Sequence, residues 1–486
     1  MSKPPVRRWR SALFALLFWA ASIAASAQTF NVVASFNIDG GDGFEPNAVV
    51  QGLDGDLYGT TIHSDFGGTF FRTTTTGTLT TLFNFPGSPD GANPLAGVTL
   101  GTDGNFYGTT WLAGANFNGT VYRTTPDGEL TTLYSFCPQT GCVDGSLPSA
   151  GVVEGTDGSF YGTTYQGGTS DGSFCNNAPY GCGTIFKITP GGTLMTVHSF
   201  CTNSKCLDGS TPVAGLVQGT DGRFYGVAAG GGSHSGGTIF RITSEGKFTV
   251  LYNFCSQSNC RDGAGPIGSL IQTVNGRFYG TTYVGGDNGR GTVFKFTLGK
   301  GLTTLYRFCH QAKCSDGSEP TAGLVQGTDG NFYGTTQIGG IRNSGILFEI
   351  TPAGVLTVMH RFCSSFDCAD GQNPGAGLIQ ATDGTFYGTT LGGGGTQSGV
   401  VYSLAMGLAP FIETLPTSGK VGASVYILGT NLTGATGVSF NGTPATFTVV
   451  SVTEITTKVP TGATTGTVTV TTPAGTLSSN LLFRVP

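Results

Sequence analysis

One short stretch recurs along this chain, and its spacing constrains the fold more than any other feature. It reads DGNFYGTT at residues 103–110 and again at 329–336, and five related copies accompany it. The steps between copies are 49, 54, 64, 54, 54 and 54 residues. A period near 50 is typical of a solenoid, a propeller or another array. The copies begin at Asp54, Asp103, Asp157, Asp221, Asn275, Asp329 and Asp383.

Each full repeat contains four stretches that are typical of short β-strands. In the second repeat they read GVTLG (97–101), NFYGTT (105–110), GTVYRT (119–124) and LTTLYSF (130–136). Asp-Gly, Gly-rich and Pro-Asp-Gly turns separate them. Four short antiparallel strands per repeat predict an all-β chain in which each repeat is one blade of a seven-bladed β-propeller.

The two ends of the repeat region complement each other. The seventh repeat stops after GVVYSL (399–404) without a fourth strand, whereas the chain begins with a spare stretch, FNVVASF (30–36). We expect this N-terminal strand to pair into the last blade and to close the ring. Closure would remove the exposed strand edges that promote aggregation.

Two repeated aspartates are interpreted as structural. The Asp before Gly in the DGNFYG motif can accept backbone N–H bonds in a turn, while its Gly tolerates a positive φ. A second element, Asp-Gly-x-x-Pro, precedes the first strand of every repeat and is interpreted as a loop brace. Calcium binding is the alternative, although no repeat gathers several carboxylates. This element begins at Asp42, Asp90, Asp144, Asp208, Asp262, Asp316 and Asp370.

Residues 1–27 are predicted to be a secretory signal rather than part of the fold. Arg7, Arg8 and Arg10 precede an apolar run, and Ala25-Ser26-Ala27 provides a small-x-small cleavage site before Gln28. A retained membrane anchor is the alternative. Without this segment the chain has 19 Lys and Arg against 28 Asp and Glu, a net charge of −9. That balance argues against nucleic acids and anionic membranes as partners.

All 12 cysteines lie after residue 27 and fall into regularly spaced pairs. In an exported protein such pairs predict disulfides, and zinc binding is the alternative. No C-x-x-C redox motif occurs. The expected pairs are Cys137–Cys142, Cys175–Cys182, Cys201–Cys206, Cys255–Cys260, Cys309–Cys314 and Cys363–Cys368.

From about Ala409 the repeat ends and the composition shifts to Thr, Val and Ser. The segments PTSGKVGASVYILGTNL, VSFNGTPA, ITTKVPTGATTGTVTV and TPAG resemble the IPT/TIG family, which implies an immunoglobulin-like β-sandwich. The DGNFYGTT…GTVYRTTPDG…LYSF units over about 30–406 resemble the GloVer tandem-repeat family of bacterial exported proteins. That resemblance implies export and supplies no catalytic residues. We expect a signal peptide at 1–27, the propeller at 28–406 and the IPT/TIG domain at 407–486.

The search for catalytic motifs finds neither a metal-binding histidine pattern, nor a nucleophile elbow, nor a phosphate loop. We predict no catalytic residue, no metal site and no cofactor. The loops after the second strands and before the first strands share one face of a propeller, where function usually resides. A mostly glutamine ring on the first strands is interpreted as a hydrogen-bond ladder, with polar-ligand binding as the alternative. Candidate ligand-binding residues on the loops are Trp111, Tyr165, Tyr180, His234, Tyr283, Asp287, Arg290 and Arg342.

These observations favour a secreted or cell-surface binding, adhesion or scaffold protein without catalysis. Its expected partner is an extracellular polysaccharide or a surface protein, because near-equivalent blades suit multivalent contact. The alternative is a secreted glycosidase or lyase that uses the loop face. An enzyme should break the repeat symmetry with acidic or basic residues in neighbouring blades.

Overall fold

The computed structural model describes residues 28–170, 175, 181–202 and 205–486. These ranges form an all-β structure, with only four short 3-10 turns outside the strands: η1 (Ile38–Gly40), η2 (Ser258–Cys260), η3 (Ala312–Cys314) and η4 (Ile341–Asn343). Within them, no helix has the length and apolar character needed to cross a membrane. The predicted signal at 1–27 and the candidate Tyr180 lie outside the described residues.

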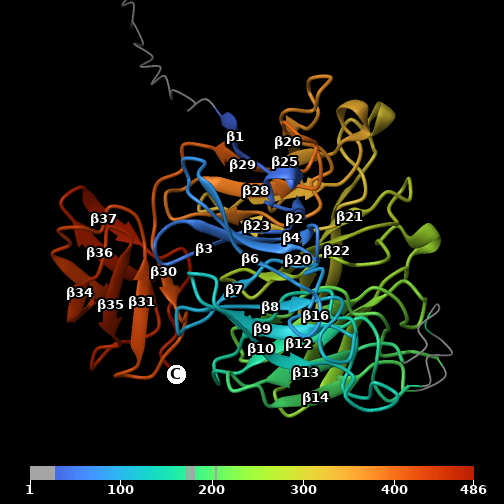
Figure 1. Ribbon diagram of the computed structural model, residues 1–486, viewed down its shortest axis with the longest axis horizontal. Coiled ribbons are helices and arrows are strands. Elements are labelled where there is room, and N and C mark those ends of the chain that lie inside the picture. Colours follow the sequence, from blue (N-terminus) through green and yellow to red (C-terminus); the bar gives the residue numbers. More distant parts are fainter. Residues whose placement is uncertain (1–27, 171–174, 176–180, 203–204) are drawn as a thin grey trace, which may run out of the picture.

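Seven antiparallel sheets follow one another through the repeat region (Figure 1). The first has β2 (Phe44–Pro46), β3 (Val50–Gln51), β4 (Leu57–His63), β5 (Thr69–Thr73) and β6 (Leu79–Asn84). The second has β7 (Thr99–Leu100), β8 (Phe106–Thr110), β9 (Thr120–Thr124) and β10 (Leu130–Ser135). The third has β11 (Val153–Glu154), β12 (Phe160–Thr164), β13 (Thr184–Ile188) and β14 (Leu194–Ser199).

The next three sheets repeat this order. The fourth has β15 (Val217–Gln218), β16 (Phe224–Ala228), β17 (Thr238–Ile242) and β18 (Phe248–Asn253). The fifth has β19 (Ile271–Gln272), β20 (Phe278–Thr282), β21 (Thr292–Thr297) and β22 (Gly301–Arg307). The sixth has β23 (Val325–Gln326), β24 (Phe332–Thr336), β25 (Ile346–Ile350) and β26 (Leu356–Arg361).

The N-terminal strand completes the seventh sheet, as the spare stretch at 30–36 predicts. This sheet has the order β1-β29-β28-β27, with β1 (Thr29–Ser35), β29 (Val400–Ala405), β28 (Phe386–Thr390) and β27 (Ile379–Gln380). Phe30 lies opposite Leu404 in the register of this pairing. The first strand of the chain therefore occupies the place of the missing fourth strand of the last repeat.

Buried aromatic rings join neighbouring sheets. The Tyr of each DGNFYG motif stacks on the Phe of the next motif, as Tyr107 does on Phe160, with ring centroids 3.8 to 4.4 Å apart in six successive pairs. These rings are almost completely buried, and burying one such side chain contributes roughly 1.5–3 kcal/mol. The repeat thus predicts both the strand and its packing partner in the next sheet.

Side-chain amides on the first strands also link neighbouring sheets. The Oε1 atoms of Gln218 and Gln272 accept the backbone N–H groups of Thr156 and Thr220 in the preceding sheet, at 3.0 and 2.8 Å. The carboxylate of Glu154 accepts the N–H of Thr102 in the same way, at 2.8 Å. These contacts form a hydrogen-bond ladder, the interpretation favoured from the sequence.

The C-terminal residues form a β-sandwich of two four-stranded sheets. One has β30 (Glu413–Leu415), β31 (Ser424–Leu428), β35 (Glu454–Lys458) and β34 (Phe447–Val449). The other has β33 (Thr443–Ala445), β32 (Gly437–Phe440), β36 (Val468–Thr472) and β37 (Gly475–Ser478). Alternating strand residues fill its core, including Ile427, Phe440 and Val470, which are buried.

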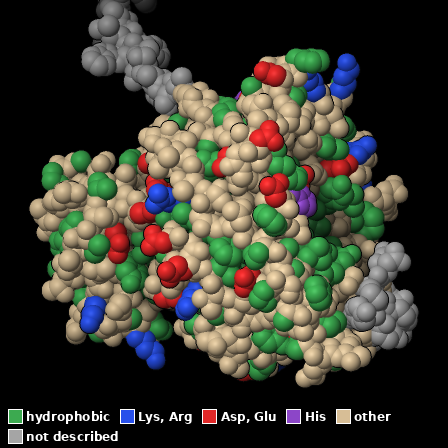
Figure 2. Space-filling model, in the orientation of Figure 1, with side chains coloured by type: hydrophobic (Ala, Val, Ile, Leu, Met, Phe, Trp, Pro, Cys, Tyr) green, Lys and Arg blue, Asp and Glu red, His purple; other side chains and the backbone are tan. Residues whose placement is uncertain are grey.

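The sandwich packs against the turns between the first and second strands of the repeat sheets (Figure 1). The Thr453 hydroxyl donates a 2.8 Å bond to the carbonyl of Leu53, and the Arg484 guanidinium contacts the carbonyl of Thr220. Figure 2 shows acidic side chains gathered along this junction. The opposite ends of the repeat sheets remain free of the sandwich.

Candidate functional site

The long loops of the repeats meet on one face. The loop that follows the second strand pairs with the segment that precedes the first strand, as in the bridge between Ala92 and Leu112. Equivalent bridges recur in five more repeats, for example between Ser146 and Gln166. We call this side, which also carries the cysteine loops, the loop face. The structure therefore brings together the loops that the sequence predicted to share a face.

The twelve cysteines form six disulfides in the pairs that the sequence predicts. The Asp of each following Asp-Gly-x-x-Pro element holds the cysteine loop. Asp316, for example, accepts the Tyr306 hydroxyl at 2.7 Å and the His310 N–H at 2.9 Å. Asp144 likewise accepts the Cys137 N–H at 3.0 Å. These contacts support the loop-brace interpretation of the second repeated aspartate.

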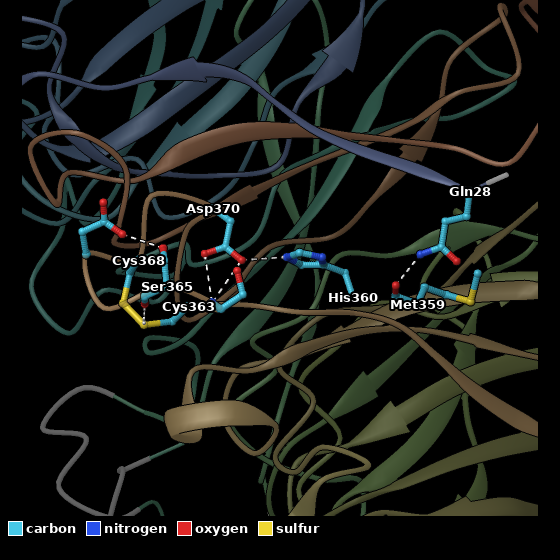
Figure 3. Close-up of polar contacts among 9 residues, drawn as sticks. Gln28, Met359, His360, Cys363, Ser365, Cys368 and Asp370 are labelled. Carbon is cyan, nitrogen blue, oxygen red and sulfur yellow. Dashed lines mark hydrogen bonds and ion pairs between the residues drawn. A yellow bond between two sulfur atoms is a disulfide. The ribbon is translucent and has the colours of Figure 1, made fainter.

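Two histidines take the place of tyrosine in this brace. The Nε2 atom of His360 lies 3.0 Å from Oδ2 of Asp370, beside the disulfide of Cys363 and Cys368 (Figure 3). Its ring stacks on Phe30 of β1 with centroids 3.7 Å apart. Burial lowers the pKa of His360, although Asp370 opposes that shift. This histidine therefore packs between strands, as the sequence suggested, and holds the loop as tyrosine does elsewhere.

A central cavity of about 540 Å³ lies between the sheets, and all seven repeats line it. Most lining residues precede the first strands, and first-strand glutamines such as Gln218 and Gln272 turn toward neighbouring sheets. Small residues occupy the equivalent lining position of every repeat, which leaves the space open. They are Ala48, Ala96, Ala150, Ala214, Gly268, Ala322 and Ala376.

One position recurs at the end of the second strand of every repeat, inside β4 in the first repeat and one residue beyond the strand in the other six. We call these seven the rim residues, and three of them, Ile62, Gln337 and Leu391, line the cavity directly. In six repeats the backbone N–H of this residue donates to the carbonyl of the residue before proline, as Trp111 does to Asn93 at 3.0 Å. The rim residues are Ile62, Trp111, Tyr165, Ala229, Tyr283, Gln337 and Leu391.

The residues before the prolines all have a left-handed backbone. Their φ angles lie between 51° and 61°, a conformation that costs energy for residues other than glycine. Six of the seven repeats nevertheless use a non-glycine residue there, so the fold holds this conformation at the rim. The seven residues are Glu45, Asn93, Leu147, Thr211, Gly265, Glu319 and Asn373.

Trp111 and Tyr165, two predicted ligand-binding residues, are brought together. They are rim residues of neighbouring repeats, and their ring centroids lie 5.4 Å apart with planes inclined at 47°. Both side chains are partly exposed. Exposed aromatic rings of this kind offer apolar faces for stacking against a ligand.

Three more predicted residues lie on the loops around the fifth repeat. The Tyr283 hydroxyl donates to Glu319 at 2.9 Å, and Arg290 pairs with the same carboxylate at 2.5 Å. The Glu319 contact and burial raise the pKa of Tyr283. Asp287 pairs with Arg261 at 2.7 Å, and Arg261 holds the pKa of this carboxyl below its usual range.

The remaining candidates lie apart from these groups. Arg342 belongs to η4, and its guanidinium lies 5.2 Å from the ring of Phe366 on a cysteine loop. His234 lies on the loop after β16 (Phe224–Ala228) and is exposed. The structure thus joins the predicted residues into an aromatic group and a charged group rather than into one catalytic constellation.

Sequence reasoning missed several residues that the loop face exposes or pairs. Glu319, Arg261 and Arg307 were not singled out, although Glu319 holds two of the predicted residues. Phe117 and Phe366 were also missed, and their side chains are 71% and 90% exposed. A position-by-position comparison of the repeats could have found Arg261, Phe117 and Phe366, because each departs from the residue types at equivalent positions.

A sulfur cluster is the closest approach to a metal site in the described ranges. The Sγ atoms of Cys175, Cys182 and Cys201 lie within 4.8 Å of one another. Each of these sulfurs belongs to a disulfide, and only the reduced thiolate is a metal ligand. The oxidised protein therefore does not offer these sulfurs as a zinc site.

Seven antiparallel sheets, with six disulfides on their loops, and a small sandwich define an extracellular-type, repeat-rich β-protein. The chain belongs to the Gloeobacter/Verrucomicrobia repeat family, whose model matches residues 20–176 and 171–402. An IPT/TIG domain matches residues 410–485. Both resemblances found in the sequence are thereby confirmed.

Several solved structures match much of the chain at low sequence identity. The extracellular domain of a hybrid two-component system from B. thetaiotaomicron is 12% identical with a TM-score of 0.47; the match covers 85% of this chain and 46% of that one. A proposed 6-phosphogluconolactonase from Bacteroides uniformis is 17% identical with a TM-score of 0.44, over 71% and 89% of the two chains. A luciferin-regenerating enzyme is 10% identical with a TM-score of 0.40, over 79% and 98%. No curated protein matches the chain.

Proposed function

We infer that this chain is an exported binding or adhesion protein without catalysis, whose loop face recognises a glycan or another surface macromolecule. In this proposal residues 28–406 form a seven-bladed β-propeller closed by its N-terminal strand. Residues 1–27 are its signal peptide, and residues 407–486 are the IPT/TIG domain. The propeller supplies a rigid ring of loops, and the last domain covers the opposite side.

Contacts between the two ends of the repeat region support the closed ring. The N–H of Thr382 donates to Oε1 of Gln51 at 3.0 Å, across 331 positions of sequence. The Thr389 hydroxyl donates to the Asn47 carbonyl at 3.1 Å. Tyr387 packs in one core cluster with Leu57, which takes the place of Phe in the first repeat. The last and first repeats therefore make contacts of the kinds that join other neighbouring repeats.

Six disulfides support export. Disulfides form and persist in oxidising compartments such as the extracellular space or the bacterial periplasm. The cysteine loops lie on the loop face, where short covalent rings restrict their motion. A loop face ordered in this way is suited to binding, since fewer groups must be immobilised when a ligand arrives.

The non-catalytic assignment rests on one observation: acidic side chains of the repeats are held in hydrogen bonds and ion pairs within the protein. The Asp of the DGNFYG motif accepts the tyrosine hydroxyl four residues later, as Asp329 does from Tyr333 at 2.8 Å. On the loop face, Asp287 and Glu319 pair with arginines. A glycosidase instead needs two carboxyl groups that face the scissile bond as acid and base or nucleophile.

Tyr283 is poorly suited to act as the base of a polysaccharide lyase. A tyrosine that acts as a general base needs a pKa near the working pH. Hydrogen bonding to Glu319 moves the pKa of Tyr283 upward instead. The hydroxyl therefore serves better as a hydrogen-bond donor than as a base.

A glycan array combined with polysaccharide hydrolysis and lyase assays tests this function. We expect saturable binding to at least one glycan class and no turnover. Turnover that disappears in Asp287→Asn or Glu319→Gln would establish the enzyme instead. A protein that binds no glycan but binds an isolated cell surface would retain the adhesion function and lose the glycan assignment.

A further inference from the structure

The loop face is chemically divided although the repeats beneath it are alike. Aromatic rings are exposed or partly exposed on the loops of the first three repeats, at Phe66, Phe117, Trp111 and Tyr165, and again at Phe366 before the seventh, whereas arginines concentrate around the fifth. One position shows the difference directly. The residue before the second repeated Asp is Val143 or Leu207 in earlier loops, with 43% and 48% of the side chain exposed, and it is Arg261 in the fifth.

Phe117, on a loop of the second repeat, has an energetically unfavourable conformation and environment. It has a φ of 61° and a 71% exposed side chain. A bulky residue rarely adopts this left-handed backbone, and exposure gains nothing from the hydrophobic effect. Other repeats place Ser235, Gly289, Asn343 and Gln397 at the equivalent position, so the scaffold does not need phenylalanine. Phe117 lies on the same loop as Trp111, which is close to Tyr165.

The charged part of the loop face holds Arg261 and Arg307 beside Asp287. Nε of Arg261 lies 2.7 Å from Oδ1 of Asp287, and Nε of Arg307 lies 3.7 Å from the same oxygen. Two guanidinium groups thus share one carboxylate. The Arg261 side chain is 54% exposed. In a chain with more acidic than basic residues, this exposed guanidinium is available to an anionic ligand.

We propose that the loop face binds an acidic polysaccharide. Sugar rings stack on Trp111 and Tyr165 at the rim, while carboxylate or sulfate groups of the same polymer contact Arg261 and Arg307. The inclined pair of rings suits successive sugars, because neighbouring units of a polysaccharide are turned relative to each other. Guanidinium groups bind carboxylates and sulfates through paired N–H donors. This inference rests on the proposed glycan-binding function and names its ligand class.

Three probe polymers separate charge from ring stacking. Polygalacturonate carries carboxylates, its methyl-esterified form has the same rings without the charge, and carrageenan carries sulfates. Binding is measured by calorimetry on the full chain exported through an oxidising compartment. We expect at least one acidic polymer to bind roughly 10-fold or more tightly than the ester, and its affinity to fall with added salt.

Matched variants assign the two sides of the site. Arg261→Gln should lower the affinity for the acidic polymer roughly 10-fold and leave the affinity for the ester unchanged. Arg223→Gln is its control, because Arg223 also pairs with one carboxylate, Asp221, but lies on a turn away from the loop face. Trp111→Ala should lower the affinity for the acidic polymer and for the ester alike, roughly 10-fold. Val355→Ala, an exposed apolar change on a turn between third and fourth strands, should change neither.

Several outcomes would overturn the inference. The inference is contradicted if the acidic polymer and the ester bind with equal affinity, or if Arg261→Gln and Arg223→Gln lose affinity equally. It is also contradicted if neither acidic polymer binds. If the glycan array nevertheless shows binding to neutral glycans, the proposed function stands and only the ligand class is wrong. If the array and the probes are both negative, the glycan-binding function fails as well.

Discussion

The hydroxyl of Tyr107 donates a 2.8 Å hydrogen bond to Oδ2 of Asp103, which lies four residues earlier in the same motif. The ring of Tyr107 stacks on Phe160 of the next sheet. One side chain therefore closes its own turn and packs against the neighbouring repeat. The fifth repeat differs, because Asn275 replaces the aspartate and no described residue hydrogen-bonds the hydroxyl of Tyr279.

Removal of the Tyr107 hydroxyl should destabilise the protein, whereas the same change in the fifth repeat should not. Tyr107→Phe loses a hydrogen bond to a carboxylate and should lower the free energy of unfolding by about 1.5–3 kcal/mol. Tyr279→Phe keeps the ring stack and loses no such bond, so it is the control. Urea denaturation of both variants measures the difference. Equal effects would show that the Asp–Tyr contact contributes little.

Deletion of residues 28–37 should destabilise the repeat region strongly. Strand β1 pairs with β29, and its Phe30 stacks on His360. Its loss would expose the edge of the last sheet and separate contacts between the first and last repeats. We expect a large fall in melting temperature in calorimetry. An unchanged melting temperature would refute closure by the N-terminal strand.

The six disulfides should be found in the exported protein and should stabilise it individually. Non-reducing peptide mapping should recover only the short-range pairs. Replacement of Cys363 and Cys368 by serine removes a bridge that closes a short ring, for which the loop-entropy model gives about 2 kcal/mol. Free thiols, or bridges between cysteines of different loops, would contradict the assigned pairing.

Stability of the junction with the C-terminal domain should depend on pH through Glu413. Burial raises the pKa of this carboxyl to about 7, although Asn480 opposes the shift. The folded protein therefore holds a proton that the unfolded chain releases near pH 4.5, so stability falls as the pH rises from about 4.5 to 7. Glu413→Gln should remove this slope and stabilise the protein at pH 8 by on the order of 1 kcal/mol. Denaturation curves at pH 5 and pH 8 measure it, and an unchanged slope would contradict it.

The strands could be predicted well from the sequence because each repeat contains residue pairs that are typical of tight turns. Asp103-Gly104 marks a turn, and the alternating Phe106 and Tyr107 face opposite neighbours, so strand bounds and ring stacking both follow from the motif. The orientation of the first-strand glutamine side chains was harder to predict from the sequence. Whether Gln218 faces a cavity or the preceding sheet depends on how neighbouring sheets approach, and one strand does not encode that distance.

The candidate site was predicted only in part for a related reason. Trp111 and Tyr165 stand out because aromatic residues are conspicuous in loops. Arg261 and Arg307 form a candidate site only because both lie near Asp287. The three residues come from separate segments of the fifth repeat region. Such a cluster becomes visible only once the loop face is assembled.

The central claim, binding without catalysis at the loop face, is tested most directly on the polymer itself. The full-length exported protein should be incubated for a long period with the polysaccharide that it binds, and the polymer's molar mass then measured by light scattering. We predict saturable binding, weakened by Trp111→Ala, with an unchanged molar mass. A fall in molar mass that Asp287→Asn or Glu319→Gln abolishes would contradict the account.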